Sequence, residues 1–245
     1  MTTLIVIAKE PVPGRVKTRL SPPFSPATAA ALAEAALTDT LQTVRDAASV
    51  RPVLALDGVP GDWLPPGFAV VRQADGGLDV RIAAAFEAAS RLSDGPAFLI
   101  GMDTPQLPRA VLEPSWGDVD ALLGPACDGG FWALGFSKPD PETVRRAVIG
   151  VPMSRPETGQ AQLARLRAAG LRTQLLPMMR DIDTAADAYA VARLCPASRF
   201  ATLLNNTVKS TVNGAVNSTA GSAADRVAGE DARAGLMSAD AAALR

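Results

Sequence analysis

The sequence predicts an α/β fold with three layers, in which a mainly parallel central sheet has helices on both faces. Two observations lead to this prediction. Short, continuous apolar runs such as residues 4–7 and 97–100 recur along the chain, as is typical of strands buried on both faces. Helical patterns separate most of these runs, and such alternation favours a parallel sheet between two helix layers.

Local signals place the elements in order. Ser25 and Pro26 predict a helix start, with Ser25 as the N-cap and Pro26 at the first helical position. Gly170 is a natural C′ residue for a helix over residues 157–169. The first helix has apolar residues at helical spacing, namely Ala30, Ala33, Leu37, Leu41, Val44 and Ala48. The other expected helices are 79–92, 106–112, 141–149 and 184–194, and the expected strands are 3–8, 52–56, 68–72, 97–100, 120–123, 131–136 and 172–176.

Composition limits the classes of domain and function. The net charge is −1, so neither a general nucleic-acid surface nor a membrane surface is indicated. Residues 201–245 contain no aromatic side chain, so we expect a functional domain over 1–196 and a low-complexity, disordered tail over 197–245. No apolar stretch is long enough to span a bilayer and no signal-peptide pattern is visible, so we expect a cytoplasmic protein.

The chain has no histidine, which excludes histidine-based catalysis and histidine metal ligands. Its two cysteines, Cys127 and Cys195, form no disulfide framework, and Cys127 is expected to pack inertly. Any metal must therefore have oxygen ligands, which favours Mg²⁺ or Mn²⁺. Carboxylates must carry out any acid–base chemistry.

A cluster of cations follows the first expected strand, in residues 8–20, which we call the basic turn. Open α/β sheets bind ligands at the carboxyl ends of their strands, so the position favours phosphate binding. Gly14 is expected to act as a hinge that directs Arg15, Lys17 and Arg19 to one place; the alternative is a solvated basic loop. The four cations are Lys9, Arg15, Lys17 and Arg19.

Carboxylates occur at two further strand or helix boundaries. Asp103 follows the apolar run 97–100 and suits a divalent cation, or alternatively an Asx turn or helix N-cap. Asp181 and Asp183 flank Ile182, so both point the same way if the segment is extended. Asp183 could share a metal with Asp103, cap the helix over 184–194, or do both at once.

Two glycine-containing loops allow close backbone approach to a ligand. Residues 124–132 include Asp128, Gly129 and Gly130, and the alternative is a hairpin turn. Residues 73–81, beginning with Gln73, suit a loop against a nucleotide or sugar, and the alternative is a plain connection.

Together, residues 8–20, 73–81, 101–107, 124–132 and 181–184 resemble the bacterial cofC-like glycosyltransferase family, formerly a domain of unknown function. This family is a branch of the GT-A nucleotide-diphospho-sugar transferase superfamily, with relatives among phospholactate and molybdenum-cofactor guanylyltransferases. The resemblance covers residues 3–195. Departures from the family pattern bear on substrate choice; they are Asp79 in place of glycine, Phe131 and Trp132 in place of a tyrosine-rich pair, and residues 153–156.

The resemblance implies a nucleotide-sugar-binding sheet whose basic turn contacts the diphosphate. The expected nucleotide or phosphate ligands are Lys9, Gly14, Arg15, Lys17, Arg19 and Gln73. It further implies a metal site at Asp103 and Asp183, and a loop of Asp128, Gly129 and Gly130 that faces the acceptor or sugar.

The predicted function is Mg²⁺- or Mn²⁺-dependent transfer of a sugar from a nucleotide sugar to a small-molecule or lipid-linked acceptor. Asp103, through the metal, and Asp128, which would orient or deprotonate the acceptor hydroxyl, are the catalytic candidates. One alternative is a guanylyltransferase-like nucleotidyltransferase that joins an NTP to a phosphorylated acceptor and releases pyrophosphate. The second alternative is a non-catalytic nucleotide-binding paralogue.

Overall fold

A computed structural model describes residues 1–210 of the chain. Its contacts define one unit over Met1–Thr202 and a second that begins at Leu203. The first unit therefore extends past the expected boundary at residue 196, and Phe200 is buried in it. Residues 203–210 are helical, and the remainder of the expected tail, 211–245, lies outside the described residues.

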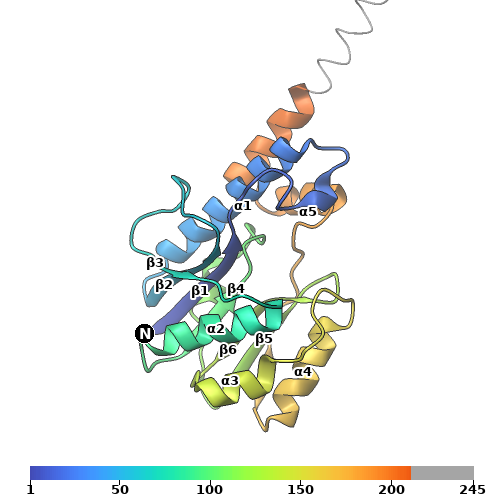
Figure 1. Cartoon of the computed structure of the whole chain (residues 1–245). Coiled ribbons are helices and arrows are strands. Elements are labelled where there is room, and N and C mark those ends of the chain that lie inside the picture. The colour runs from blue at the N-terminus through green and yellow to red at the C-terminus, as the bar shows by residue number, and fades with distance from the viewer. Residues whose placement is uncertain (211–245) are drawn as a thin grey trace, which may run out of the picture. The chain divides into compact units, whose positions relative to one another are not determined.

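A seven-stranded sheet forms the centre of the first unit (Figure 1). Its strand order is β3-β2-β1-β4-β6-β5-β7, and β6 alone runs antiparallel to its neighbours β4 and β5. The sheet is therefore mainly parallel, as predicted. The strands are β1 (Thr2–Lys9), β2 (Val50–Asp57), β3 (Ala69–Arg72), β4 (Ala97–Ile100), β5 (Ala121–Pro125), β6 (Phe131–Phe136) and β7 (Thr173–Leu175).

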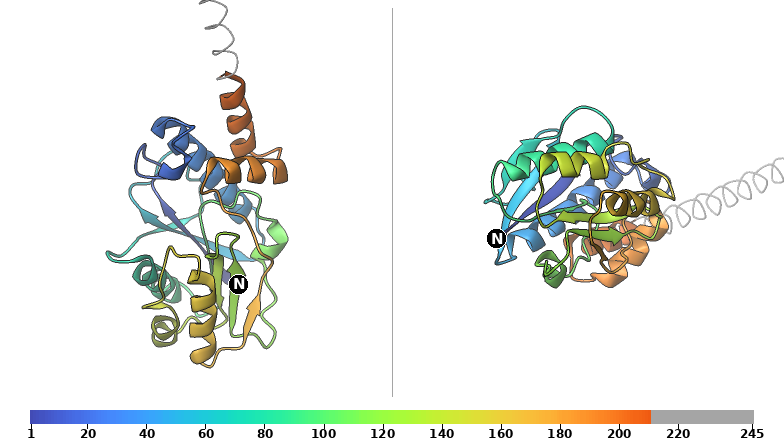
Figure 2. Two further views of the ribbon diagram at one scale, coloured as in Figure 1. Left: turned by 90° about the vertical axis from the view of Figure 1, so that its right-hand side faces the viewer. Right: turned by 90° about the horizontal axis from the view of Figure 1, so that it is seen from below.

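Helices cover both faces of the sheet, which gives the predicted three layers (Figures 1 and 2). Side chains of α2, α3 and α4 pack on one face, and side chains of α1 pack on the other. The helices are α1 (Pro26–Arg45), α2 (Leu78–Ser90), α3 (Pro141–Val148), α4 (Thr158–Ala168) and α5 (Ala185–Leu194), with 3₁₀ turns at Thr18–Leu20 and Arg109–Leu112.

Helix boundaries follow the expected capping signals at two places. The Ser25 hydroxyl accepts a hydrogen bond from the Thr28 amide at 3.1 Å, and Gly170 follows α4 with φ of 79°. Ala48 differs from expectation, since α1 ends at Arg45 and Ala48 is exposed beyond it.

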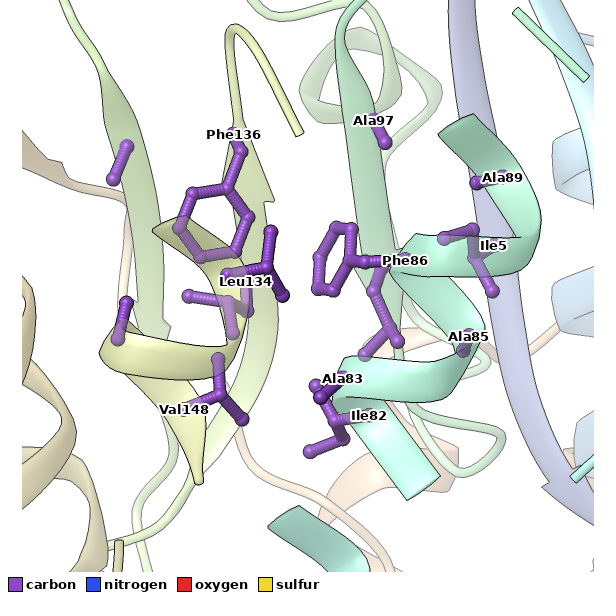
Figure 3. Close-up of a cluster of buried hydrophobic side chains, with 14 of the residues drawn as sticks. Ile5, Ile82, Ala83, Ala85, Phe86, Ala89, Ala97, Leu134, Phe136 and Val148 are labelled. Carbon is purple, nitrogen blue, oxygen red and sulfur yellow. The ribbon is translucent and has the colours of Figure 1, made fainter. Parts of the chain in front are cut away.

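The core between the sheet and helices α2 and α3 is built from aromatic and aliphatic side chains of both the strands and the helices (Figure 3). Phe86 of α2 meets Phe136 of β6 edge to face, with ring centroids 5.0 Å apart. This contact joins α2 to β6, which pairs with β4 in the sheet. On the other side of β4, Val6 of β1 pairs with Ile100, so the basic turn and Asp103 leave neighbouring strands at the same edge.

Candidate functional site

Three aspartates converge at the carboxyl edge of the sheet. Asp103 follows β4, while Asp181 and Asp183 lie between β7 and α5. The Ile182 amide donates to the Asp103 carbonyl at 3.2 Å, and the Ile182 side chain is buried. Carboxylate oxygens of Asp103, Asp181 and Asp183 all lie within 4.8 Å of one another. The sequence prediction had paired only Asp103 and Asp183 as ligands; the alternation around Ile182 was the signal for Asp181.

Asp183 does not cap α5, which was the alternative considered for it. Thr184 is the N-cap: its hydroxyl accepts from the Asp187 amide at 3.3 Å, and Asp187 accepts in return from the Thr184 amide at 3.0 Å. Because this capping box satisfies the helix start, the Asp183 carboxylate is available to the cluster.

Two cations of the basic turn reach these carboxylates. Lys17 Nζ lies 2.5 Å from Asp103 Oδ2 and 3.2 Å from Asp183 Oδ1, and its side chain is only 11% exposed. Arg19 lies 3.2 Å from the other Asp183 oxygen but remains exposed. The Lys17 backbone is left-handed, with φ of 47°, at the start of the 3₁₀ turn that the sequence did not predict.

The charges of the cluster shift two pKa values. Burial by itself would lower the pKa of Lys17, but the charges of Asp103 and Asp183 outweigh it and hold that pKa above its usual value. Burial, together with the charges of Asp103, Asp128 and Asp183, raises the pKa of Asp181 to about 7. The three carboxylates of the cluster outnumber the two cations, Lys17 and Arg19, that pair with them.

The other two cations lie elsewhere, so the expectation that Arg15 points to the same place as Lys17 and Arg19 was wrong. Lys9 and Arg15 are exposed, and neither forms an ion pair within residues 1–210. Arg81 Nη1 donates to Asp57 at 2.8 Å and is the first reason that the pKa of Asp57 is low; the charges of Lys9 and Arg15 lower it further. The basic turn therefore presents cations at two positions.

Gln73 contacts the protein at this same edge. Its Nε2 donates to the carbonyls of Ala8 at 2.7 Å and Ala55 at 2.9 Å, which links the ends of β1 and β2. Its Oε1 accepts from Arg81 at 3.3 Å. These bonds account for the side-chain amide without a ligand, and a nucleotide contact from Gln73 stays a prediction.

The loop over residues 126–130 is a hairpin turn between β5 and β6, the alternative considered for it. The Ala126 amide donates to the Gly130 carbonyl at 3.0 Å, and the Gly130 amide donates to Asp128 Oδ1 at 2.8 Å. A Cβ on Gly129, where φ is 89°, would lie 1.9 Å from the Pro156 carbonyl oxygen. The Gly129 carbonyl also accepts from the Gly159 amide at 2.8 Å, so protein backbone explains this glycine.

Several neighbouring residues have structural roles that the sequence left open. Trp132 is buried, and its Nε1 donates to the Pro177 carbonyl at 3.0 Å. Asp79 accepts from the Gly150 amide at 2.8 Å and so ties the start of α2 to the loop after α3. Cys127 was expected to pack inertly, but at the tip of the hairpin it is exposed.

The aspartate cluster fits a divalent cation by its donor set. Three carboxylates supply the hard oxygen ligands that Mg²⁺ and Mn²⁺ prefer. Burial and then the charges of neighbouring carboxylates raise the pKa of Asp181, and added positive charge would offset both. Among the described residues, no helix is long and apolar enough to cross a membrane.

Known proteins resemble this chain in sequence or in fold. Residues 33–155 match the family described as "uncharacterized protein conserved in bacteria (DUF2064)". No curated protein matches the chain. A solved structure described as a "putative nucleotide-diphospho-sugar transferase" from Desulfovibrio desulfuricans G20 is 25% identical, with a TM-score of 0.75 over 85% of this chain and 95% of that one.

A cytidylyltransferase from Leptospira borgpetersenii serovar Hardjo-bovis (strain JB197) is 13% identical, with a TM-score of 0.50 over 86% of this chain and 95% of that one. This second likeness shows the fold alone. The family match spans half of the chain, and the strand order and the cluster at the carboxyl edge agree with the resemblance seen in the sequence. The chain belongs to the bacterial DUF2064 family, within the nucleotide-diphospho-sugar transferase-like α/β fold.

Proposed function

We propose that this protein is a metal-dependent transferase that moves a sugar from a nucleotide sugar to a hydroxyl of a small-molecule or lipid-linked acceptor. The observation that carries the proposal is the meeting of Asp103, Asp181 and Asp183 with the basic turn at the carboxyl edge of the sheet. The description of the Desulfovibrio desulfuricans G20 structure supports the choice of donor.

The donor phosphates bind along the basic turn. Lys9 and Arg15 are exposed and have no ion pair among the described residues, so binding an anion breaks no existing bridge. Asp103, Asp181 and Asp183 would hold Mg²⁺ or Mn²⁺, and the bound ion would supply positive charge against the leaving diphosphate.

Asp128 serves the acceptor side of the site. The Gly130 amide fixes its Oδ1 at 2.8 Å and thereby orients the carboxylate, while Oδ2 remains able to accept a hydrogen bond. In the reaction, the acceptor oxygen bonds to the sugar carbon as the sugar–phosphate bond breaks, and the hydroxyl proton passes to the carboxylate. With no histidine in the chain, a carboxylate is the available base.

Nucleotidyl transfer is the second candidate. The observation in its favour is that the basic turn offers cations at two positions, Lys17 and Arg19 at the aspartates and Lys9 and Arg15 near Asp57. Two such positions suit the longer polyphosphate of an NTP. This reaction would release pyrophosphate rather than NDP.

The test measures thermal stabilisation by NTPs, NDPs and nucleotide sugars, with and without Mn²⁺, followed by product analysis. Ligands that bind the folded chain raise its stability by mass action. A Mn²⁺-dependent shift with one nucleotide sugar, and release of NDP, is expected. Pyrophosphate release would establish nucleotidyl transfer, and binding without either product would establish a non-catalytic nucleotide-binding protein.

Asp103→Asn should abolish the Mn²⁺-dependent part of the shift, and Asp62→Asn, at an exposed position, is its matched control. If Asp103→Asn leaves the Mn²⁺-dependent shift intact, the metal assignment is wrong.

A further inference from the structure

The side chain of Lys17 lies where a metal ion would need to be bound. Its Nζ contacts Asp103 Oδ2 at 2.5 Å and Asp183 Oδ1 at 3.2 Å, and both residues belong to the proposed metal site. A divalent cation needs contacts of about 2.1 Å to such oxygens. An ammonium group that shares the same two carboxylates therefore competes with the ion for their charge and repels it.

The surroundings of Lys17 favour this pairing when no other cation is present. The side chain is largely buried, and the narrow space beside it is lined by Leu32, Ala33, Ala36 and Ile182. A buried ammonium in such surroundings requires opposite charge within hydrogen-bond distance. Asp103 and Asp183 provide that charge.

The turn that carries Lys17 contains two residues with a left-handed backbone. Lys17 itself has a left-handed backbone, which is uncommon for a residue with a side chain. Gly14 precedes it with φ of 76° and open space around it. Lys9 and Arg15, which have no ion pair among the described residues, lie on the same turn and are available to an incoming phosphate.

From these contacts we infer that Lys17 is a resident counter-ion that occupies the aspartates in the ligand-free protein and exchanges places with the divalent cation. The cation binds Asp103 and Asp183, and the Lys17 ammonium is released toward the donor phosphates. This inference rests on the proposed function. It makes metal binding weak in the absence of nucleotide and couples it to phosphate binding, because the phosphate offers Lys17 a replacement anion.

The test is the affinity of the full chain for Mn²⁺ alone, measured by electron paramagnetic resonance of free Mn²⁺. Lys17→Met keeps an apolar stem without the charge and should bind Mn²⁺ at least about tenfold more tightly than the unsubstituted protein. Lys138→Met, at an exposed position on another part of the surface, is the matched control and should not change the affinity. Equal or weaker Mn²⁺ binding by Lys17→Met overturns the inference.

A second measurement uses the unsubstituted protein, in case Lys17→Met does not fold. The chain has four lysines, Lys9, Lys17, Lys138 and Lys209, so ¹⁵N-lysine spectra are simple to assign with Lys17→Arg. The hydrogen-bonded ammonium signal of Lys17 should be present without metal and lost at saturating Mg²⁺. A signal that survives saturation overturns the exchange.

The outcomes separate this inference from the proposed function. If Mn²⁺ binds the unsubstituted protein and Lys17→Met equally, the exchange fails while the metal site stands. If Mn²⁺ binds neither, even with nucleotide present, the exchange and the metal part of the proposed function fail together.

Discussion

The basic turn and the hairpin loop over residues 126–130 both contain glycine, and both lie near the aspartate cluster. The sequence predicts a substrate contact for each, but the structure treats their glycines differently. In the basic turn, a Cβ on Gly14 would meet nothing within 4 Å, and the charged side chains reach other segments of the chain. In the hairpin loop, Gly129 packs directly against the backbone of Pro156. A loop glycine therefore does not by itself indicate a ligand, because Gly129 is explained by protein backbone and nothing approaches Gly14. Oppositely charged side chains gathered from distant segments are the better indication of a site.

The largest expected effect separates the two glycines. Gly129→Ala should lower the free energy of unfolding by about 3 kcal/mol or more, because the new Cβ would overlap a backbone oxygen and the residue would keep a left-handed conformation. Gly14→Ala should cost only about 1 kcal/mol, from backbone strain alone. Urea unfolding in the presence of a chelator measures both, and equal losses would show that the hairpin contact is not as tight as described.

The second-largest expected effect tests the aspartate cluster that the basic turn contacts. Asp103→Asn should weaken Mn²⁺ binding by about 100-fold or more, since it removes one of three carboxylates that converge. Calorimetric titration in the presence of a saturating nucleotide measures this loss. Asp118→Asn, a substitution at an exposed aspartate, should leave the affinity unchanged, and a similar loss in both variants would argue against a localised site.

A smaller effect distinguishes the two halves of the basic turn. Arg15→Ala should weaken nucleotide binding about tenfold through loss of one charge-assisted hydrogen bond to phosphate. Its free energy of unfolding should not change, because Arg15 is exposed and forms no ion pair in the described part of the chain. Arg167→Ala, an exposed arginine on α4, is the control for fluorescence-monitored titration. Unchanged nucleotide affinity in Arg15→Ala would place the phosphates elsewhere.

The smallest effect depends on pH. Because the pKa of Asp181 is raised to about 7 from a usual value of 3.8, the folded metal-free chain binds more protons than the unfolded chain between these values. Its stability therefore falls as the pH rises through this range. In chelator, Asp181→Asn should be more stable than the unsubstituted protein at pH 8, by on the order of 1 kcal/mol after solvent screening.

This advantage of Asp181→Asn should shrink toward pH 5, where the carboxyl group is protonated and neutral in the folded protein. Thermal unfolding at the two pH values measures it. A difference that is independent of pH would mean that burial and the neighbouring carboxylates do not raise the pKa of Asp181.

Most of the fold was predictable from the sequence because its signals are local. Apolar runs located β1 to β6, and Ser25, Pro26 and Gly170 marked helix ends by their own backbone and capping preferences. The errors also had local causes. Ala48 continues the helical spacing past the point where α1 ends, and the 3₁₀ turn at Thr18–Leu20 has no periodic pattern that would reveal so short an element.

The site was predictable in part. Asp103 and Asp183 were expected to meet, and the structure brings them together and adds Asp181. The sequence of residues 8–20 could not predict that the cations of the basic turn lie at two positions. Those positions depend on where β2 and the segment before α5 lie in space. The same holds for Gly129, whose neighbour Pro156 lies beyond β6 and α3 in the chain.

By itself, the sequence determined the α/β class, the order of the elements and the exclusion of histidine from acid–base and metal chemistry. These follow from residue periodicity and from the absence of histidine, which no folding step can change. Only the tertiary structure decided that Lys17 and Arg19 pair with the aspartates, that Lys9 and Arg15 do not, and that Thr184 rather than Asp183 caps α5. Such pairings depend on distances between segments far apart in the chain, and Coulomb and hydrogen-bond energies become specific only once packing of the sheet has fixed those distances.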